Sequence, residues 1–367
     1  MARILACGAF LKNSACLFDT QTPQAPLWSA VHGDLSDPAA CAALEQSVQD
    51  LLARPGAPLD AVAHDLHPDF FSTRLALEWA QQHGLPAVAV QHHHAHLAAV
   101  AAEHRETGPL LGLALDGVGL GADGSAWGGE LLWMHGAECR RIGHLAPIAM
   151  PGGDAAAREP WRLAAAVLHA AGLGEQIVAR FAHRPAAAAV AQLLSKGLRC
   201  PPTTSLGRWF DASAGLLDVR QASAYEGQAA MLLEALGTNA DALAAAQPLE
   251  PAAPHWLPLS AQGVLDPLPL LTHLAQEAQA ARGAAFFHAA LAHGLARWVA
   301  QAAAQTAVRT VALGGGCFLN HLLTELLLPL LAEQGLSVLQ ARQAPPNDGA
   351  ISLGQAWVAL CTMQAGD

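Results

Sequence analysis

Two histidines spaced four residues apart, His92 and His96, are the side chains of this sequence best suited to bind a metal ion. They follow an apolar segment, residues 86–90, with the composition of a buried β-strand. If a helix begins near Gln91, both imidazoles lie on one face of that helix and can reach the same ion. A chain with 18 histidines contains such pairs by chance. The position of this pair at the carboxyl end of a predicted strand favours a metal site over a chance pair, because ligands bind at that end of the strands in α/β sheets.

Two aspartates in glycine-rich segments are the carboxylates that could complete this site. Asp116 lies in the run Leu-Asp-Gly-Val-Gly-Leu-Gly-Ala-Asp-Gly, and Asp348 lies in the run Pro-Pro-Asn-Asp-Gly-Ala-Ile-Ser-Leu-Gly. Glycines let the backbone approach a ligand closely, so these aspartates are typical of binding loops. His93 and His94 lie on other faces of the expected helix, where partial burial or substrate contact suits them better than metal binding.

The length and composition indicate a large globular protein. With 367 residues and a mass of 38.0 kDa, the chain can bury a sizeable core, most naturally divided between two lobes. Hydrophobic residues make up 53% of the sequence, yet no uninterrupted apolar stretch reaches the roughly 18 residues that a membrane helix needs. We therefore expect no membrane-spanning segment, and we interpret residues 4–11 as a first strand rather than a signal sequence.

The net charge and the cysteine content indicate which partners and which cellular compartment to expect. The formal net charge is -11 and no stripe of lysine and arginine occurs, so we expect no nucleic-acid surface. The seven cysteines are scattered, without a Cys-x-x-Cys pair. This pattern predicts a protein of the reducing cytoplasm and excludes a zinc ribbon within this sequence.

The first third of the sequence is predicted to form one α/β lobe. Strands are expected at residues 4–10, 15–18, 27–31, 61–64 and 86–90, and helices at residues 38–52 and 71–83. This β-β-β-α-β-α order is that of a ribonuclease-H-like lobe, the unit duplicated in actin, sugar kinases and heat-shock chaperones. We therefore predict an α/β fold built from two such lobes.

A second lobe is expected from residue 109 onward. Strands are predicted at residues 110–116, 126–134 and 310–313, and helices at residues 161–171, 186–194, 225–236 and 284–304. The segment 239–269 is rich in alanine and proline and is expected to be a surface connection. The predicted division is a first lobe of residues 1–108 and a second lobe of residues 109–367 with helical insertions, whose C-terminal helix could pack back on the first lobe.

A glycine run lies between the strand predicted at residues 310–313 and a following helix. The run Leu-Gly-Gly-Gly-Cys-Phe-Leu-Asn ends at Asn320. Such a loop directs backbone N–H groups toward an anion such as phosphate, although packing in a tight turn would also explain its glycines. It has neither the lysine of a Walker loop nor the glycine spacing of a dinucleotide fingerprint. Cys317 is better explained as a small buried residue than as a nucleophile.

Three further segments combine charges with glycine or aromatic residues. Asp211 and Glu226 could bind ribose hydroxyls, or they could cap a helix or form a surface ion pair. Arg158 and Arg162 follow a glycine turn and could clamp an anionic substrate, or they could belong to a solvated first helical turn. In the polar segment 64–74, His67 and Arg74 could line a substrate channel or cap the next helix.

Taken together, these motifs resemble the C-terminal module of the HypF family, the carbamoyltransferases of nickel–iron hydrogenase maturation, within the wider TsaD-like family. The resemblance covers nearly the whole sequence. The motifs that carry it lie at residues 8–13, 64–69, 91–96, 116–119, 127–130, 151–154, 225–228 and 346–349. Their number and order make the resemblance specific, and the Gly349-Ala350 pair, where Gly-Gly is expected, is a minor departure.

The resemblance implies the two-lobed TsaD-like fold and a set of ligand contacts. It implies a divalent metal, with iron or zinc expected first, that contacts the nucleotide phosphate and is bound by His92, His96, Asp116 and Asp348. It places ribose contacts at Asp211 and Glu226, with Gly227 beside them. It places the adenine and phosphate loop at Gly315, Gly316 and Asn320.

The resemblance also implies an activity and a partner. The chain would receive carbamoyl-adenylate, the ATP-derived substrate that carries AMP, and would pass its carbamoyl group to the C-terminal cysteine of a HypE-like acceptor protein. His93 or His94 would take the thiol proton, and Arg158 or Arg162 would orient either carbamoyl-adenylate or the C-terminal carboxylate of the acceptor. The alternatives are a TsaD-like protein acting on tRNA, which the acidic charge disfavours, a small-molecule O-carbamoyltransferase, and a non-catalytic scaffold that binds HypE.

Longer HypF proteins carry further regions ahead of this module. The family assigns the formation of carbamoyl-adenylate to acylphosphatase-like, zinc-binding and YrdC-like regions, and their motifs do not occur in this sequence. We therefore expect the transfer half-reaction alone, with carbamoyl-adenylate supplied by a separate protein.

Overall fold

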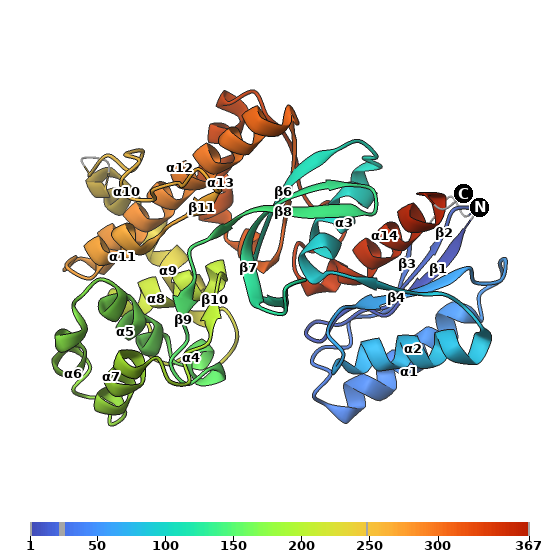
Figure 1. The fold of residues 1–367 in the computed structure, drawn as a ribbon, viewed down its shortest axis with the longest axis horizontal. Coiled ribbons are helices and arrows are strands. Elements are labelled where there is room, and N and C mark those ends of the chain that lie inside the picture. Colours follow the sequence, from blue (N-terminus) through green and yellow to red (C-terminus); the bar gives the residue numbers. More distant parts are fainter. Residues whose placement is uncertain (1, 22–25, 247–248, 366–367) are drawn as a thin grey trace.

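The computed structural model describes residues 2–21, 26–246 and 249–365. Its first lobe, at one end of the molecule in Figure 1, is built on a five-stranded sheet. The strands are β1 (Arg3–Ala6), β2 (Cys16–Asp19), β3 (Leu27–Trp28), β4 (Ala61–Asp65) and β5 (Ala87–Val90). Their order in the sheet is β3-β2-β1-β4-β5, with β1 to β3 antiparallel and β4 and β5 parallel to β1. This is the ribonuclease-H-like arrangement that the order of elements predicts.

Alternating side chains of β1 supply the first lobe with two apolar faces. Leu5 belongs to the core under helices α1 (Pro38–Leu52) and α2 (Phe71–His83), whereas Ile4 faces the opposite side of the sheet. Both helices have the predicted bounds, because their ends carry strong signals. Proline occupies the first turn of α1, and α2 ends at Gly84 in the left-handed conformation.

The second sheet repeats the strand arrangement of the first. Its principal strands are β6 (Leu110–Leu120), β7 (Ala126–His135), β8 (Glu138–Leu145), β12 (Thr310–Gly314) and β13 (Ser337–Leu339). The order is β8-β7-β6-β12-β13, with the first three antiparallel and the last two parallel to β6. The short strand β11 (Val264–Leu265) adds to β8, and β9 (Ile148–Ala149) and β10 (Pro202–Thr203) lie off this path. The protein therefore has the two-lobed α/β fold of the actin and sugar-kinase class.

The two lobes exchange one helix each. Helix α3 (His92–His104) follows β5 but packs on β6 and β12 of the second sheet. Helix α14 (Ile351–Ala365) packs on β1 and β4 of the first sheet, and α3 and α14 contact each other between the sheets (Figure 1). Gly354 permits this contact, because a Cβ there would lie 1.8 Å from the carbonyl oxygen of Ala95.

Helices fill the rest of the second lobe and pack around one large apolar core. They are α4 (Asp154–Arg158), α5 (Pro160–Ala170), α6 (Ile177–Arg180), α7 (Ala187–Lys196), α8 (Leu206–Leu216), α9 (Gln228–Gly237), α10 (Ala240–Ala246), α11 (Leu268–Leu274), α12 (Ala280–Thr306) and α13 (His321–Glu333). Short 3-10 turns occur at η1 (Gly174–Gln176), η3 (Gly316–Leu319) and η4 (Asp348–Ala350). Among the described residues, no helix combines the length and apolar character needed to cross a bilayer.

Three local predictions were wrong. Strand β5 is an edge strand with Ala87 and Ala89 exposed, because among the described residues no further strand pairs with its outer edge; only Val90 is buried. Strand β8 was not expected, since its sequence is strongly charged. The segment 239–269 contains α10, β11 and the start of α11 and is partly core, with Leu257 only 1% exposed and packed against Gly294 of α12.

Candidate metal centre and cavity

Four side chains from three parts of the chain meet between the lobes. His92 and His96 begin α3, Asp116 lies in β6 and Asp348 opens η4. One ligand atom from each of them lies within 4.8 Å of the other three. Asp116 Oδ2 is 3.5 Å from His92 Nε2 and 3.4 Å from His96 Nε2. Asp348 Oδ1 is 3.6 and 3.5 Å from the same two nitrogens.

These distances suit a bound metal ion better than direct hydrogen bonds. The Nε2 atoms of His92 and His96 are buried and have no hydrogen-bond partner. Four ligands placed about 2.0–2.2 Å from a central ion in tetrahedral geometry lie about 3.3–3.6 Å from one another. The separations between the imidazole nitrogens and the carboxylate oxygens fall at this spacing. The residues therefore fit a divalent ion held by two nitrogens and two oxygens.

The electrostatics of the cluster follow from its burial and its charges. Burial alone would lower the pKa of His92, but the neighbouring carboxylates, Asp348 foremost, hold it well above the usual value for histidine. Burial would raise the pKa of Asp116, yet the nearby His92 and His96 hold it well below its usual range. Without an ion, the imidazoles and carboxylates stabilise each other's charges, and a divalent cation would take over that role from the protonated rings.

Asp65, at the end of β4, orients the first histidine. His92 Nδ1 donates to Asp65 Oδ2 at 2.9 Å, and the backbone N–H of His67 donates to Asp65 Oδ1 at 2.9 Å. This contact fixes the proton of His92 on Nδ1 and leaves Nε2 free for a metal. The sequence prediction missed Asp65, although the pairing of β4 with β5 places it opposite Val90, just before α3.

A bulge in β6 presents Asp116. Between Leu115 and Gly119 the pairing of β6 with β7 shifts, so three residues of β6 lie opposite one residue of β7. The Asp116 side chain accepts a hydrogen bond from the backbone N–H of Gly316 at 3.0 Å. Ser205 Oγ lies 2.8 Å from the carbonyl oxygen of Asp116, so the loop before α8 holds the bulge from its other side.

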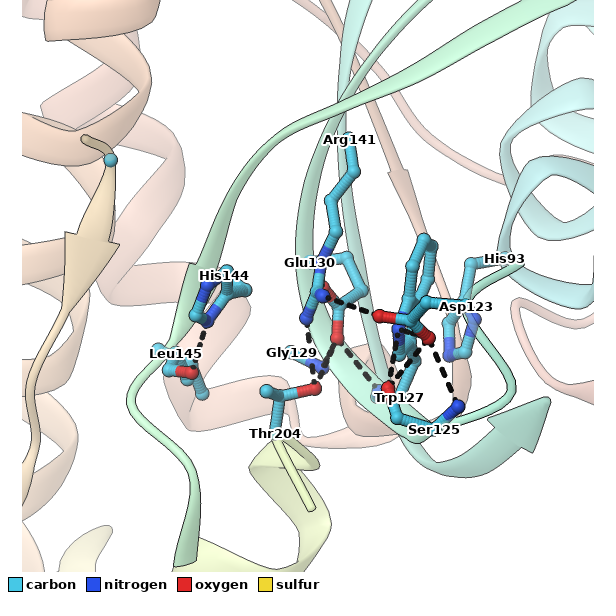
Figure 2. A network of polar contacts seen from close by, with 12 residues as sticks. His93, Asp123, Ser125, Trp127, Gly129, Glu130, Arg141, His144, Leu145 and Thr204 are labelled. Atoms are coloured by element: carbon cyan, nitrogen blue, oxygen red, sulfur yellow. Dashed lines mark hydrogen bonds and ion pairs between the residues drawn. The ribbon is translucent and has the colours of Figure 1, made fainter. Parts of the chain in front are cut away.

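A buried carboxylate on β7 supports the strand that pairs with this bulge (Figure 2). Glu130 is fully buried and accepts hydrogen bonds from Arg141 Nε at 2.6 Å, from the N–H of Gly129 at 3.3 Å and from the Thr204 hydroxyl. The Arg141 guanidinium also lies over the Trp127 ring, 4.2 Å from its centre. The network ties β7, β8 and β10 together beside the candidate metal centre.

A cavity of about 520 Å³ opens next to the four ligands. This volume is typical of small-molecule sites. Its walls contain the two carboxylates of the metal centre and five of the predicted nucleotide contacts, namely Asp211, Glu226, Gly227, Gly316 and Asn320. The remaining predicted contact, Gly315, does not line the cavity, but it determines the conformation of the glycine loop. Its φ is +104°, and a Cβ there would lie 2.3 Å from the carbonyl oxygen of Leu115.

Two cations face this largely acidic cavity. Lys12 comes from the first lobe and its Nζ lies 2.6 Å from Glu226 Oε2 in the second lobe. Arg208 Nη2 lies 3.0 Å from Asp211 Oδ2. Burial raises the pKa of Asp211 to about 6, although Arg208 works in the opposite direction. The ion pair between Lys12 and Glu226 is exposed, whereas the pair between Arg208 and Asp211 is largely buried. Because water weakens an exposed ion pair, Lys12 is the positive group most available to a ligand phosphate.

The five residues predicted to transfer a proton, orient the substrate or line its channel, His93, His94, Arg158, Arg162 and His67, do not line the cavity. His93 and His94 point to other faces of the helix than His92, and both are almost fully buried. Burial lowers the pKa of His93 well below the usual value and that of His94 to about 4, so both rings are neutral near pH 7. The other three residues lie elsewhere. Arg162 pairs with Glu159, Arg158 is exposed on α4, and His67 stacks on Phe70 at 4.2 Å.

The fold and the site define a two-lobed α/β protein of the actin and sugar-kinase class with a candidate metal centre beside a nucleotide-sized cavity. Residues 1–103 match the family described as the HypF Kae1-like domain. Residues 112–355 match the family described as carbamoyltransferase, Kae1-like domain, second subdomain. The chain therefore belongs to the HypF carbamoyltransferase family.

Curated relatives and solved structures agree with this assignment. The chain is 52% identical to carbamoyltransferase HypF2 of Cupriavidus necator over an alignment of 381 positions, gaps included. The alignment covers 97% of the chain but 46% of that relative. The chain is 51% identical to a carbamoyltransferase HypF homolog of the same organism, covering 98% of the chain and 91% of that relative. A crystal structure of full-length HypF in a phosphate- and nucleotide-bound form matches 100% of the chain and 47% of its own length, with 28% identity and a TM-score of 0.86. The chain thus spans about half the length of the longer HypF proteins.

Proposed function

We propose that this chain passes the carbamoyl group of carbamoyl-adenylate to the C-terminal cysteine of a HypE-like acceptor protein. Membership of the HypF family supports the reaction class, and the solved HypF bound to phosphate and nucleotide supports a nucleotide substrate. The observation that carries the proposal is the meeting of His92 and His96 with Asp116 and Asp348, two carboxylates that also line a cavity large enough for a nucleotide.

The proposed substrate position follows from the chemistry of the cavity walls. The adenylate phosphate would lie toward the metal centre, where the ion would polarise it and neutralise charge on the departing AMP. Lys12 would leave Glu226 and contact the phosphate from the first lobe. Glu226 and Asp211 would then accept hydrogen bonds from the ribose hydroxyls, and Gly316 and Asn320 would hold the nucleotide from the glycine loop.

The transfer step needs no nucleophile from this chain. The acceptor sulfur attacks the carbamoyl carbon, a C–S bond forms, the C–O bond to the phosphate breaks, and AMP leaves with the bonding electrons. A cysteine with its ordinary pKa of about 8.5 is already a few per cent thiolate near pH 7. The burial of His93 and His94 favours release of the thiol proton to water over transfer to either ring.

The acceptor is expected to approach near the loop that precedes Glu226. The N–H of Ser223 in this loop donates to the carbonyl oxygen of Arg158 at 2.8 Å, which connects α4 to the cavity rim. Arg158 is exposed, so it could contact the C-terminal carboxylate of the acceptor. Arg162 is already paired with Glu159 and suits this role less well.

A single-turnover assay tests the proposal. The purified chain, loaded with Zn²⁺ or Fe²⁺, would be mixed with synthetic carbamoyl-adenylate and a HypE-like acceptor, and the carbamoylated cysteine would be detected by mass spectrometry. We expect one carbamoyl group per acceptor, and we expect His92→Ala to lower metal content and transfer together. His135→Ala, at an exposed histidine of β7, serves as the matched control. Acceptor binding without transfer would indicate a scaffold and refute the proposal.

A further inference from the structure

The helix that supplies both histidine ligands also holds the loop that carries a third ligand. Glu103 lies seven residues after His96 and eleven after His92, close to two and three whole helical turns, so the three side chains share one face of α3. Asp348 follows the loop of residues 340–347, which connects β13 to η4. Glu103, His96 and residues of this loop line the same narrow crevice.

The Glu103 carboxylate receives three successive backbone N–H groups of this loop. Glu103 Oε2 accepts from Arg342 N at 2.5 Å, and Oε1 accepts from Gln343 N at 3.0 Å and from Ala344 N at 2.7 Å. Consecutive backbone N–H groups that converge on an anion form a nest, and charge-assisted hydrogen bonds of this kind are the stronger class. The neighbouring His104 Nε2 donates to the carbonyl oxygen of Gln340 at 2.8 Å and adds a fourth contact.

Apolar packing does little to hold the first part of this loop. Arg342, Gln343 and Pro345 are exposed, and Ala344 is half-buried. Beyond it, the backbone N–H of Gly315 donates to the carbonyl oxygen of Pro346 at 2.8 Å. The loop is therefore fixed to α3 at its start and to the glycine loop at its end.

We propose that Glu103 is a positioning residue that fixes Asp348 for metal binding by anchoring the loop before it. The inference rests on the proposed metal site and adds a residue that never touches the ion. Loss of the anchor would leave Asp348 held mainly by the contacts of Pro346 and Gly349, so its carboxylate would sample positions away from the two histidines more often. The expected effect is a weaker metal affinity with an unchanged set of ligands. Loss of a residue that orients a ligand typically weakens affinity about 10- to 100-fold. Because Glu103 acts through the loop, we expect about tenfold.

The test compares the full chain with its Glu103→Ala and Glu103→Gln variants. Dissociation constants for Zn²⁺ and Mn²⁺ would be measured by competition with a chromophoric chelator, and hydrogen exchange would be followed in peptides covering residues 340–350. Glu103→Ala should weaken metal binding about tenfold and speed hydrogen exchange in residues 340–350. Glu103→Gln keeps one acceptor oxygen, so its metal affinity and exchange rate should lie between those of the unsubstituted chain and Glu103→Ala. Glu78→Ala, at an exposed position of α2, should change neither.

A second comparison separates positioning from general destabilisation. In an Asp348→Asn background, Glu103→Ala should weaken Zn²⁺ binding by less than about twofold, because the ligand that it positions is already lost. A full tenfold effect in that background would overturn the inference, as would Glu103→Ala binding both ions as tightly as the unsubstituted chain. If the unsubstituted chain bound neither ion, the proposed metal site would fail and this inference with it.

Discussion

Replacement of Asp65 by asparagine is the sharpest test of how the metal centre is built. The carboxylate of Asp65 is 1% exposed and the His92 ring is 3% exposed, so water cannot take over the 2.9 Å hydrogen bond between them. An amide has one acceptor oxygen instead of two, so it can serve His92 Nδ1 or the N–H of His67, but not both as the carboxylate does. The imidazole would then carry its proton on Nε2 for part of the time, which blocks metal binding.

The expected loss is about 10- to 100-fold in Zn²⁺ affinity, or roughly 1.4–2.7 kcal/mol. Competition with a chromophoric chelator at constant pH measures it, and thermal melting of the metal-free chain reports any separate loss of stability. Asp69→Asn is the matched control, because this aspartate lies four residues further along and is exposed. An Asp65→Asn chain that bound Zn²⁺ within about twofold of the unsubstituted chain would show that Asp65 does not orient the ring.

Two further predictions concern stability. Gly315→Ala should destabilise the chain by roughly 1–3 kcal/mol or more, because the added Cβ would lie 2.3 Å from the Leu115 carbonyl oxygen. Gly335→Ala, also at positive φ but with open space around it, should cost only about 1 kcal/mol, and equal shifts in melting temperature would contradict the steric explanation. Burial raises the pKa of Asp211 to about 6, so the stability that its proton contributes is full below about pH 4 and is lost as the pH rises through about 6. Asp211→Asn should therefore flatten the melting temperature between about pH 4 and pH 7, and the same pH dependence in both chains would show that Asp211 is not responsible.

Local signals predicted much of the fold and of the candidate site. Proline in the first turn of α1, glycine after α2 and the apolar segment before His92 are features of neighbouring residues, and the helices occur where they indicate. Asp116 and Asp348 were proposed from their glycine-rich surroundings, and the family resemblance pointed to the same two aspartates. These signals are short-range, so they do not depend on how the lobes pack.

The supporting residues were not predicted, because their roles arise from contacts between distant parts of the chain. Asp65 matters because β4 pairs with β5, and Glu103 matters because α3 reaches a loop more than 230 residues later. The alanine-rich segment 239–269 was misjudged for a related reason. Alanine fits helices and loops alike in a hydrophobicity pattern, so the burial of Leu257 against α12 left no periodic signal.

The exchange of α3 and α14 between the lobes has a consequence for synthesis on the ribosome. The first sheet is made before the second, yet α14, the helix that covers its second face, follows the whole second sheet in the sequence (Figure 1). Roughly 250 residues separate α3 from α14, which corresponds to about 10–50 s at common elongation rates. During that time the apolar face containing Ile4 and Ala63 lacks its own helix. The first lobe can therefore complete its core only after α14 has been made, and Asp348 can join the two histidines only after the whole second sheet has been made.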